Sequence, residues 1–163
     1  MGIKTLTVNG ILAALYIAVT ALVAPVGFSF IQFRVSEILN HLVVFNKKYM
    51  IGIVLGVFIS NLLFSPMKAY DLIFGTGQSL IALSLTVLAG MVIKNIWGRM
   101  IFNTLIFTFT MCIIAFEIKL AMDIPETFWY MWATIAAGEF IIMAIGMPVI
   151  YALNKRLKFK DLV

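Results

Sequence analysis

Long apolar segments make up most of this 163-residue chain, and the charged residues fall largely between them. Hydrophobic residues account for 63% of the sequence and charged residues for 12%, whereas about a quarter of the residues of a soluble domain are charged. A helix needs roughly 20 apolar residues to cross a bilayer, so the length allows about six crossings with short loops. The sequence therefore predicts an all-α integral membrane protein, a six-helix transmembrane bundle that forms a single domain over residues 1–163.

One of the six segments differs from the rest. The segment 34–45, which follows a short outer loop at 28–33, is too short and too polar to cross lipid alone. We expect it to lie inside the bundle, where polar side chains are tolerated. The first helix is expected to stop at Pro25 and Gly27. The expected helices cover residues 6–24, 34–45, 49–64, 101–122 and 127–153. A further helix, the fourth in order, is expected to run from the end of a loop at 68–71 to about residue 93.

Positive charge is concentrated on one side of these segments. Lysine and arginine are retained on the cytoplasmic side of a membrane, so their distribution fixes the orientation. With both termini cytoplasmic, only Arg34, Lys68 and Lys119 fall toward the outer half. The other nine basic residues lie at the inner face: Lys4, Lys47, Lys48, Lys94, Arg99, Lys155, Arg156, Lys158 and Lys160. We therefore expect a multi-pass protein of the cell membrane.

Acidic residues show the opposite distribution. Asp161 alone lies in the inner tail, and Glu139 lies mid-way through the last helix. The remaining five acids face outward: Glu37, Asp71, Glu117, Asp123 and Glu126. Several carboxylates open to the exterior suggest the capture of a polar or cationic solute from outside.

The run from Ile31 to Glu37 is the densest polar cluster. Arg34 and Glu37 are three residues apart, and Glu37 and His41 are four apart, so on an α-helix all three share one face. For Arg34 we favour an ion pair that makes a buried polar segment tolerable. For Glu37, ligand contact and a structural role have equal weight. His41, the only histidine, can carry a proton, but a lone histidine is more often a hydrogen-bonded packing residue.

Polar residues also mark the outer half of the third and fourth helices. Asp71 and Gln78 lie on one face at the outer end of the fourth helix. Asp71 either caps that helix, whose N-terminus favours a negative charge, or contacts a ligand. Asn61, in the third helix, is more often an interhelical hydrogen-bond partner than a ligand.

Glu139 is the strongest single signal of function. It follows Gly138, and no basic residue lies within a turn of it. A charge at the bilayer centre costs roughly 2.5–3.5 kcal/mol, so an acid kept there must face a cavity, a partner or a ligand. Glu117 lies about one to two turns below the outer end of the fifth helix. Trp132, roughly two turns above Glu139 on the same face, is a candidate stacking plane for a flat ligand.

Gly10, Ala14 and Ala18 recur at a spacing of four in the first helix. Small residues at this period allow another helix to approach closely. The helix that packs against these residues belongs either to the same bundle or to a partner protein, and the spacing does not distinguish these two possibilities.

The chain lacks the residue groups that catalysis requires. Its one cysteine, Cys112, excludes an intrachain disulfide and a thiolate metal cluster. One histidine cannot form a His–Glu metal motif, and no Gly-rich nucleotide loop is followed by a lysine. We expect a transport subunit without its own ATPase rather than an enzyme, with no metal, cofactor or nucleic acid.

Several motifs, in their order along the chain, resemble one transporter family. The most specific is the Gln-Phe-Arg-Val-Ser-Glu run at 32–37, and together the motifs cover nearly the whole chain. The others lie at 13–16, 60–62, 71–75, 116–117, 138–139 and 146–148. With these motifs the chain resembles the QueT family, the substrate-binding S components of energy-coupling factor (ECF) vitamin transporters.

The resemblance implies a six-helix S component that takes up a queuosine precursor, a 7-deazaguanine such as the 7-aminomethyl form. It also implies an EcfT-like transmembrane partner and two ATPase subunits. In similar proteins the small-residue face of the first helix, here Gly10, Ala14 and Ala18, is where EcfT docks.

The chemistry of such a ligand suggests roles for the candidate residues. Our hypothesis assigns Glu139 to the guanine edge, Glu117 or Glu37 to the ammonium, and Asp71 or Gln78 to the remaining polar atoms. Two alternatives stay open: an S component for another vitamin, and a self-sufficient carrier that uses Glu139 and Glu117 as proton relays.

Overall fold

The computed structural model describes residues 2–27, 32–67, 69–122 and 124–163. Within these ranges every regular element is a helix, which confirms the all-α fold class. Five helices are long and apolar enough to cross a membrane. They are α1 (Ile3–Gly27), α2 (Met50–Phe64), α3 (Ala69–Val92), α4 (Ile96–Ala121) and α5 (Phe128–Leu157). A short 3₁₀ helix, η2 (Lys47–Tyr49), directly precedes α2, and a short helix, α6 (Phe159–Leu162), follows α5.

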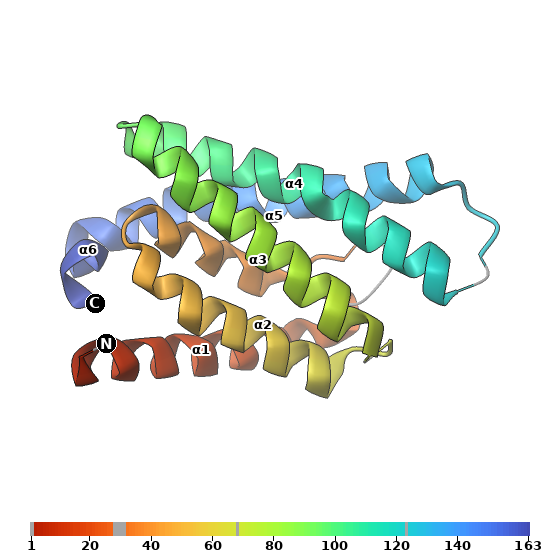
Figure 1. Cartoon of the computed structure of the whole chain (residues 1–163), viewed down its shortest axis with the longest axis horizontal. Helices are drawn as coiled ribbons and strands as arrows, with labels where there is room; N and C mark the ends of the chain where they lie inside the picture. The colour runs from red at the N-terminus through yellow and green to blue at the C-terminus, as the bar shows by residue number, and fades with distance from the viewer. Residues whose placement is uncertain (1, 28–31, 68, 123) are drawn as a thin grey trace.

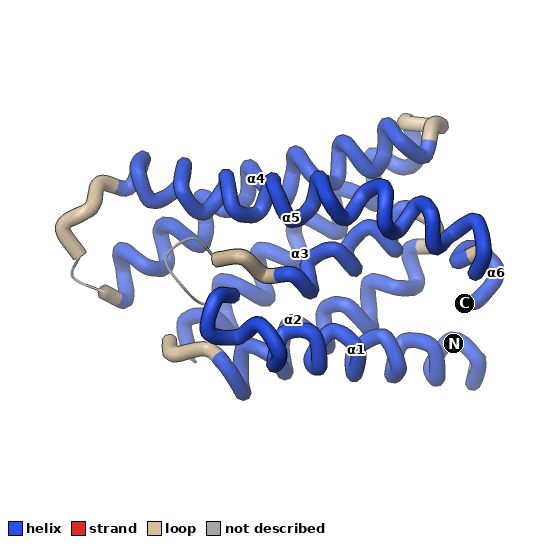
Figure 2. The backbone as a smooth tube through the Cα atoms, turned by 180° about the vertical axis from the view of Figure 1, so that it is seen from behind, coloured by secondary structure: helices blue, strands red, loops and turns tan. Residues whose placement is uncertain are grey.

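The remaining expected segment is a short 3₁₀ helix, η1 (Val35–Val44). Its 10 residues at about 2.0 Å each are shorter than the hydrocarbon core of roughly 30 Å. The structure thus shows five membrane-length helices instead of six. Since η1 packs against all five of them, its expected position inside the bundle is confirmed. Figure 2 shows the loop that leads into η1 lying among the long helices.

The path of the chain places both termini at one end of the bundle. Helices α1 and α2 run side by side in the same direction (Figure 1). The helix η1, which follows α1 in sequence, returns the chain to the end of the bundle where α2 begins. The N- and C-termini lie together with the start of α2, the link between α3 and α4, and the end of α5. We call this the basic end, because it carries Lys4, Lys47, Lys48, Lys94, Arg99, Lys155, Arg156, Lys158 and Lys160.

Helix α6 folds back to close the basic end. The Lys4 ammonium donates a hydrogen bond to the Asp161 carbonyl over 2.8 Å, and the Tyr49 hydroxyl donates to the Phe159 carbonyl over 2.7 Å. The buried Phe159 ring also lies 6.3 Å, between centroids, from the ring of Tyr49. These contacts tie the tail to the start of α1 and to η2.

Several element bounds differ from the sequence-based expectation. Helix α4 begins at Ile96, earlier than expected, because the Asn95 side chain caps it by accepting a hydrogen bond from the Trp97 N–H at 2.8 Å. Helix α3 begins at Ala69, so Asp71 lies in its first turn and not in a loop. Helix α1 passes through Pro25 and ends at Gly27. Helix α5 continues to Leu157.

The expectations that fell on Ile31, Lys68, Asp123 and most of the loop 28–33 lie outside the described residues.

Helices α1 and α2 pack closely because two glycines of α2 face α1. A Cβ atom at Gly52 would lie 2.6 Å from the Asn9 carbonyl oxygen, and one at Gly56 would lie 2.7 Å from the Tyr16 Cβ. Small residues four apart allow this approach in membrane helices. The Asn9 side chain in turn accepts a hydrogen bond from the Gly52 N–H at 2.7 Å, which satisfies a donor in the first turn of α2.

The small residues of α1 lie on its other side. Gly10, Ala14 and Ala18 are exposed, and a Cβ at Gly10 would meet no atom within 4 Å. Leu12 and Tyr16, by contrast, are buried. The Gly10–Ala14–Ala18 face therefore does not pack inside the bundle, and its role in docking a partner stays a prediction.

We expect Gly52→Ala to lower the free energy of unfolding by about 1–3 kcal/mol, the usual cost of forcing extra atoms into a packed interface. The new Cβ has to displace the backbone of α1. Gly10→Ala is the matched control: it should leave stability unchanged or raise it slightly, because alanine favours helix. Thermal unfolding of the purified protein in detergent measures both, and equal stability of the two variants would contradict the close approach of α1 and α2.

Candidate ligand-binding site

Four carboxyl groups and one guanidinium are buried together in the half of the bundle away from the basic end. Glu37, Asp71, Glu117 and Glu139 are each at most 1% exposed. They come from η1, α3, α4 and α5, and Arg34, just before η1, acts electrostatically on all four. We call these five residues the acidic cluster.

Arg34 pairs with Asp71 across the cluster. The Arg34 Nη2 lies 3.1 Å from the Asp71 Oδ1, and the Ser65 hydroxyl donates to the other carboxylate oxygen. The Asn61 amide donates to the Asp71 carbonyl over 2.9 Å, which confirms the favoured interpretation of Asn61 as an interhelical hydrogen-bond partner. Asp71 is thus more than a helix cap, because it joins α3 to the segment before η1.

The ion pair of Arg34 was expected within its own helix and is found elsewhere. A shared face for Arg34, Glu37 and His41 requires an α-helix, but η1 is a 3₁₀ helix. With three residues per turn, Glu37 and His41, four apart, no longer align. Arg34 precedes η1 and pairs with Asp71 of α3.

Glu37 is held by uncharged donors. The Tyr16 hydroxyl donates to Oε1 over 2.7 Å, and the Asn40 amide donates to Oε2. Sequence analysis did not predict that Tyr16 and Asn40 contact Glu37. The available signal was a tyrosine on the same face of the first helix as Asn9, Leu12 and Thr20, which are all buried. Both oxygens of Glu37 are therefore already occupied within the protein.

Glu117 and Glu139 differ from the other two acids of the cluster. Neither oxygen of the buried Glu139 carboxyl group has a hydrogen-bond partner among the described residues. The buried Glu117 carboxyl group lies beside that of Asp71, and its oxygens accept no hydrogen bond from a described donor. A buried polar group without a partner costs about 1–3 kcal/mol, and more when it is charged. These oxygens are the acceptors that a ligand with several N–H groups would use.

Charge is also unbalanced in the cluster. One guanidinium faces four carboxyl groups, so full ionisation leaves three negative charges without a cation inside the cluster. Lys119 does not supply the missing positive charge, because its ammonium donates hydrogen bonds to the Ile124 carbonyl at 2.9 Å and the Glu126 carbonyl at 3.0 Å. Among the residues that the structure describes, no group of three or more His, Cys, Asp or Glu side chains is placed to hold a metal ion.

Gln78 lies on the same face of α3 as Asp71, and both are buried. Its amide donates to the Thr110 hydroxyl of α4 over 2.8 Å. Gln78 therefore ties α3 to α4, and Thr110 in turn precedes Glu117 by about two turns on one face of α4.

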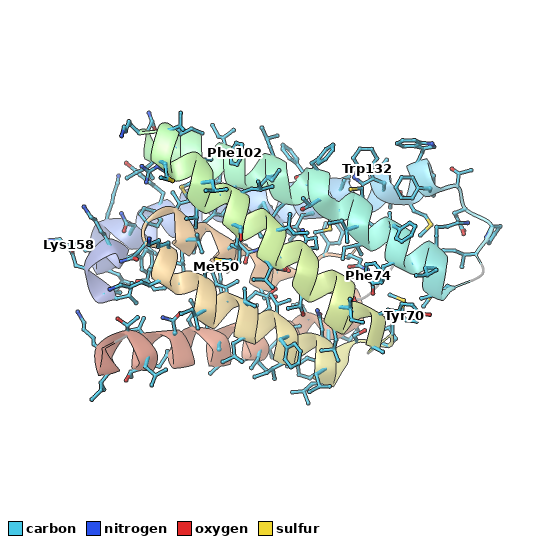
Figure 3. All side chains as sticks on the ribbon, viewed as in Figure 1. Met50, Tyr70, Phe74, Phe102, Trp132 and Lys158 are labelled. Carbon is cyan, nitrogen blue, oxygen red and sulfur yellow. The ribbon has the colours of Figure 1, made fainter. Side chains whose placement is uncertain are left out.

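Trp132 lies in an aromatic cluster between α4 and α5. Its indole N–H donates to the Phe109 carbonyl over 3.2 Å, and its ring lies 5.6 Å from that of Phe109, edge to face. Figure 3 shows Trp132 well away from Tyr70 and Phe74 at the start of α3. No contact given by the structure joins it to the acidic cluster, and its role as a stacking plane stays a prediction.

His41 is a hydrogen-bonded packing residue, as the more common role of a lone histidine suggested. The ring lies 3.0 Å, through Nε2, from the Met143 carbonyl and 3.2 Å, through Nδ1, from the Asn103 amide. Because an amide N–H only donates, Nδ1 accepts and Nε2 donates. His41 thereby joins η1 to α4 and α5.

Two comparisons bear on identity. The sequence model of the QueT transporter family matches residues 6–155. The queuosine precursor transporter QueT of Lactococcus lactis subsp. cremoris (strain MG1363) is 37% identical over 155 residues, which cover 90% of this chain and 89% of that relative. No solved structure matches the chain. The family match spans all five residues of the acidic cluster and confirms the resemblance seen in the sequence motifs. The chain belongs to the QueT transporter family and is a multi-pass protein of the cell membrane.

Proposed function

We propose that the chain is the substrate-binding membrane subunit, the S component, of an ECF-type importer. It captures a queuosine precursor from outside, a 7-deazaguanine such as the 7-aminomethyl form. The observation that carries the proposal is the pair of buried carboxyl groups, Glu117 and Glu139, whose oxygens accept no hydrogen bond from a described donor. The name of the 37% identical relative supports the choice of substrate class.

The guanine edge and a carboxylate are complementary. A deazaguanine presents two adjacent donors, its ring N–H and its amino group, and one carboxylate can accept both in a bidentate manner. We assign Glu139 to this edge, because it is buried and lies mid-way along α5. A flat ring also favours aromatic walls. Phe74, which is half-buried one turn after Asp71, is a candidate for one wall.

The ammonium of the 7-aminomethyl group needs a second carboxylate. Glu37 is already held by Tyr16 and Asn40, so we assign the ammonium to Glu117. Bound there, it offsets part of the excess negative charge of the acidic cluster. The Asp71 or Gln78 side chain contacts the remaining polar atoms, and Arg34 holds Asp71 in place.

The orientation follows from the basic end. Lysine and arginine favour the cytoplasmic side, so both termini are cytoplasmic and the acidic cluster lies in the outer half of the membrane. Counted with η1, the chain then passes six times between the two ends, and η1 makes the sixth passage within the protein instead of in lipid.

Energy for import comes from other subunits. The exposed Gly10–Ala14–Ala18 face of α1 offers a surface without bulky side chains on which an EcfT-like transmembrane subunit docks. That subunit connects the bundle to two ATPase subunits. A self-sufficient carrier is the competing proposal, in which Glu117 and Glu139 carry protons across the membrane.

Glu139→Gln should abolish tight binding of radiolabelled 7-aminomethyl-7-deazaguanine to the purified protein. An amide has only one acceptor oxygen and no charge, so the bidentate contact is lost; a charged hydrogen bond of this kind is worth about 1.5–3 kcal/mol, roughly 10- to 150-fold in affinity. Asp161→Asn, at the basic end, is the control and should bind normally. Unchanged affinity of Glu139→Gln, with the variant folded, would reject the assignment.

Vesicle reconstitution separates the two transport proposals. Vesicles that hold this chain alone should bind the labelled base but not accumulate it, and addition of the EcfT-like and ATPase subunits with ATP should start uptake. Uptake driven by a pH gradient in vesicles of the chain alone would favour the proton-coupled carrier.

The same assay tests the docking face. Ala14→Trp should keep ligand binding and lose ATP-driven uptake, because the indole keeps the partner helix at a distance. Ser84→Trp, a similar change at an exposed position of α3, is its control and should keep both.

A further inference from the structure

A groove and a hollow meet at Lys47, near the basic end. The groove, of about 490 Å³, lies between α2 and α3, and its walls include Met50, Val54, Leu55 and Phe58. The hollow, of about 280 Å³, is bordered by the end of η1 and by α3, and Lys47 and Arg99 both line it. Lys47 lines both spaces, so the apolar groove ends beside a hollow that is lined by two cations.

The groove has the length of one membrane leaflet. From Lys47 to Phe58 the chain advances eleven residues, or about 16 Å at 1.5 Å per residue. This is close to half of the roughly 30 Å hydrocarbon core of a bilayer. The exposed apolar residues of the groove, such as Leu55 and Phe58, face the region of the acyl chains. Figure 3 shows Met50, at the start of the groove, on the same half of the bundle as Lys158.

The hollow is suited to a phosphate group. The Arg99 guanidinium is fixed by hydrogen bonds to the carbonyls of Ile93 at 2.6 Å and Val44 at 3.5 Å, and these use only two of its five N–H donors. No acidic residue lines the hollow. On the far side of Arg99 a second hollow, of about 310 Å³, is lined by Lys158 and Lys160. Basic pockets at this depth between membrane helices bind anionic lipid head groups.

We propose that one anionic phospholipid binds here, with an acyl chain in the α2–α3 groove and its phosphate between Lys47 and Arg99. The site is separate from the acidic cluster and does not depend on which solute that cluster binds. The continuous apolar and basic surfaces select a molecule that carries both a chain and an anion.

Native mass spectrometry of the full-length chain in detergent tests the proposal, with phosphatidylglycerol and phosphatidylcholine of identical acyl chains as probes. The wild type should retain one phosphatidylglycerol in preference to phosphatidylcholine. Lys47→Gln should weaken phosphatidylglycerol retention about fivefold, the value of one lysine near a membrane surface. Lys94→Gln, at an exposed lysine of the same end that lines neither space, should change nothing.

A second variant tests the groove without changing charge. Leu55→Trp fills the groove and should reduce retention of phosphatidylglycerol, whereas Leu62→Trp, at an exposed position of α2 outside the groove, should not.

Equal retention of the two lipids, or equal behaviour of Lys47→Gln and Lys94→Gln, would overturn the proposal. Competition by soluble glycerol phosphate at the same concentration as the lipid would show an anion site without a lipid. Loss of EcfT-like subunit association in Lys47→Gln, without any change in lipid retention, would assign the surface to a protein partner instead.

Discussion

The cost of burying a carboxylate without a partner governs this structure. In hydrocarbon an ionised acid is tolerated only beside a cation, a set of hydrogen-bond donors or a ligand. The Asp71 carboxylate accepts hydrogen bonds from Arg34 and Ser65. The Glu37 carboxylate accepts hydrogen bonds from Tyr16 and Asn40. The carboxyl oxygens of Glu117 and Glu139 accept no hydrogen bond from a described donor and share the charge of Arg34 with the other two acids. Two acids thus have hydrogen-bond donors within the fold, and the other two are the ones that we propose for the ligand.

The rest of the bundle holds this arrangement in place. Gly52 and Gly56 bring α2 onto α1, which fixes the Tyr16 ring whose hydroxyl orients Glu37. Asn61, on α2, bonds to the start of α3 beside Asp71. His41 bonds to α5, and through Asn103 to α4. Because η1 touches all five long helices, a shift of any one of them changes the geometry of the acidic cluster.

Sequence patterns predicted part of the fold and of the acidic cluster, and the contacts that they missed were missed for identifiable reasons. Apolar length predicted the long helices, and the cost of an isolated acid in the membrane singled out Glu139. The partner of Arg34 could not be predicted from local spacing, because Asp71 lies 37 residues away on another helix. The donors of Glu37 were missed, since Tyr16 lies 21 residues away on another helix. The exposure of Gly10, Ala14 and Ala18 likewise depends on which side of α1 meets α2, and spacing does not carry that information.

The central claim is that the acidic cluster recognises a cation through carboxylates that the fold leaves unpaired. Calorimetric titration of the purified chain with 7-aminomethyl-7-deazaguanine and with its uncharged 7-hydroxymethyl analogue tests this most directly, since the two molecules differ in charge and little in shape. We predict that the charged form binds at least about tenfold more tightly, a difference of about 1.4 kcal/mol. Equal affinities for the two would contradict the account.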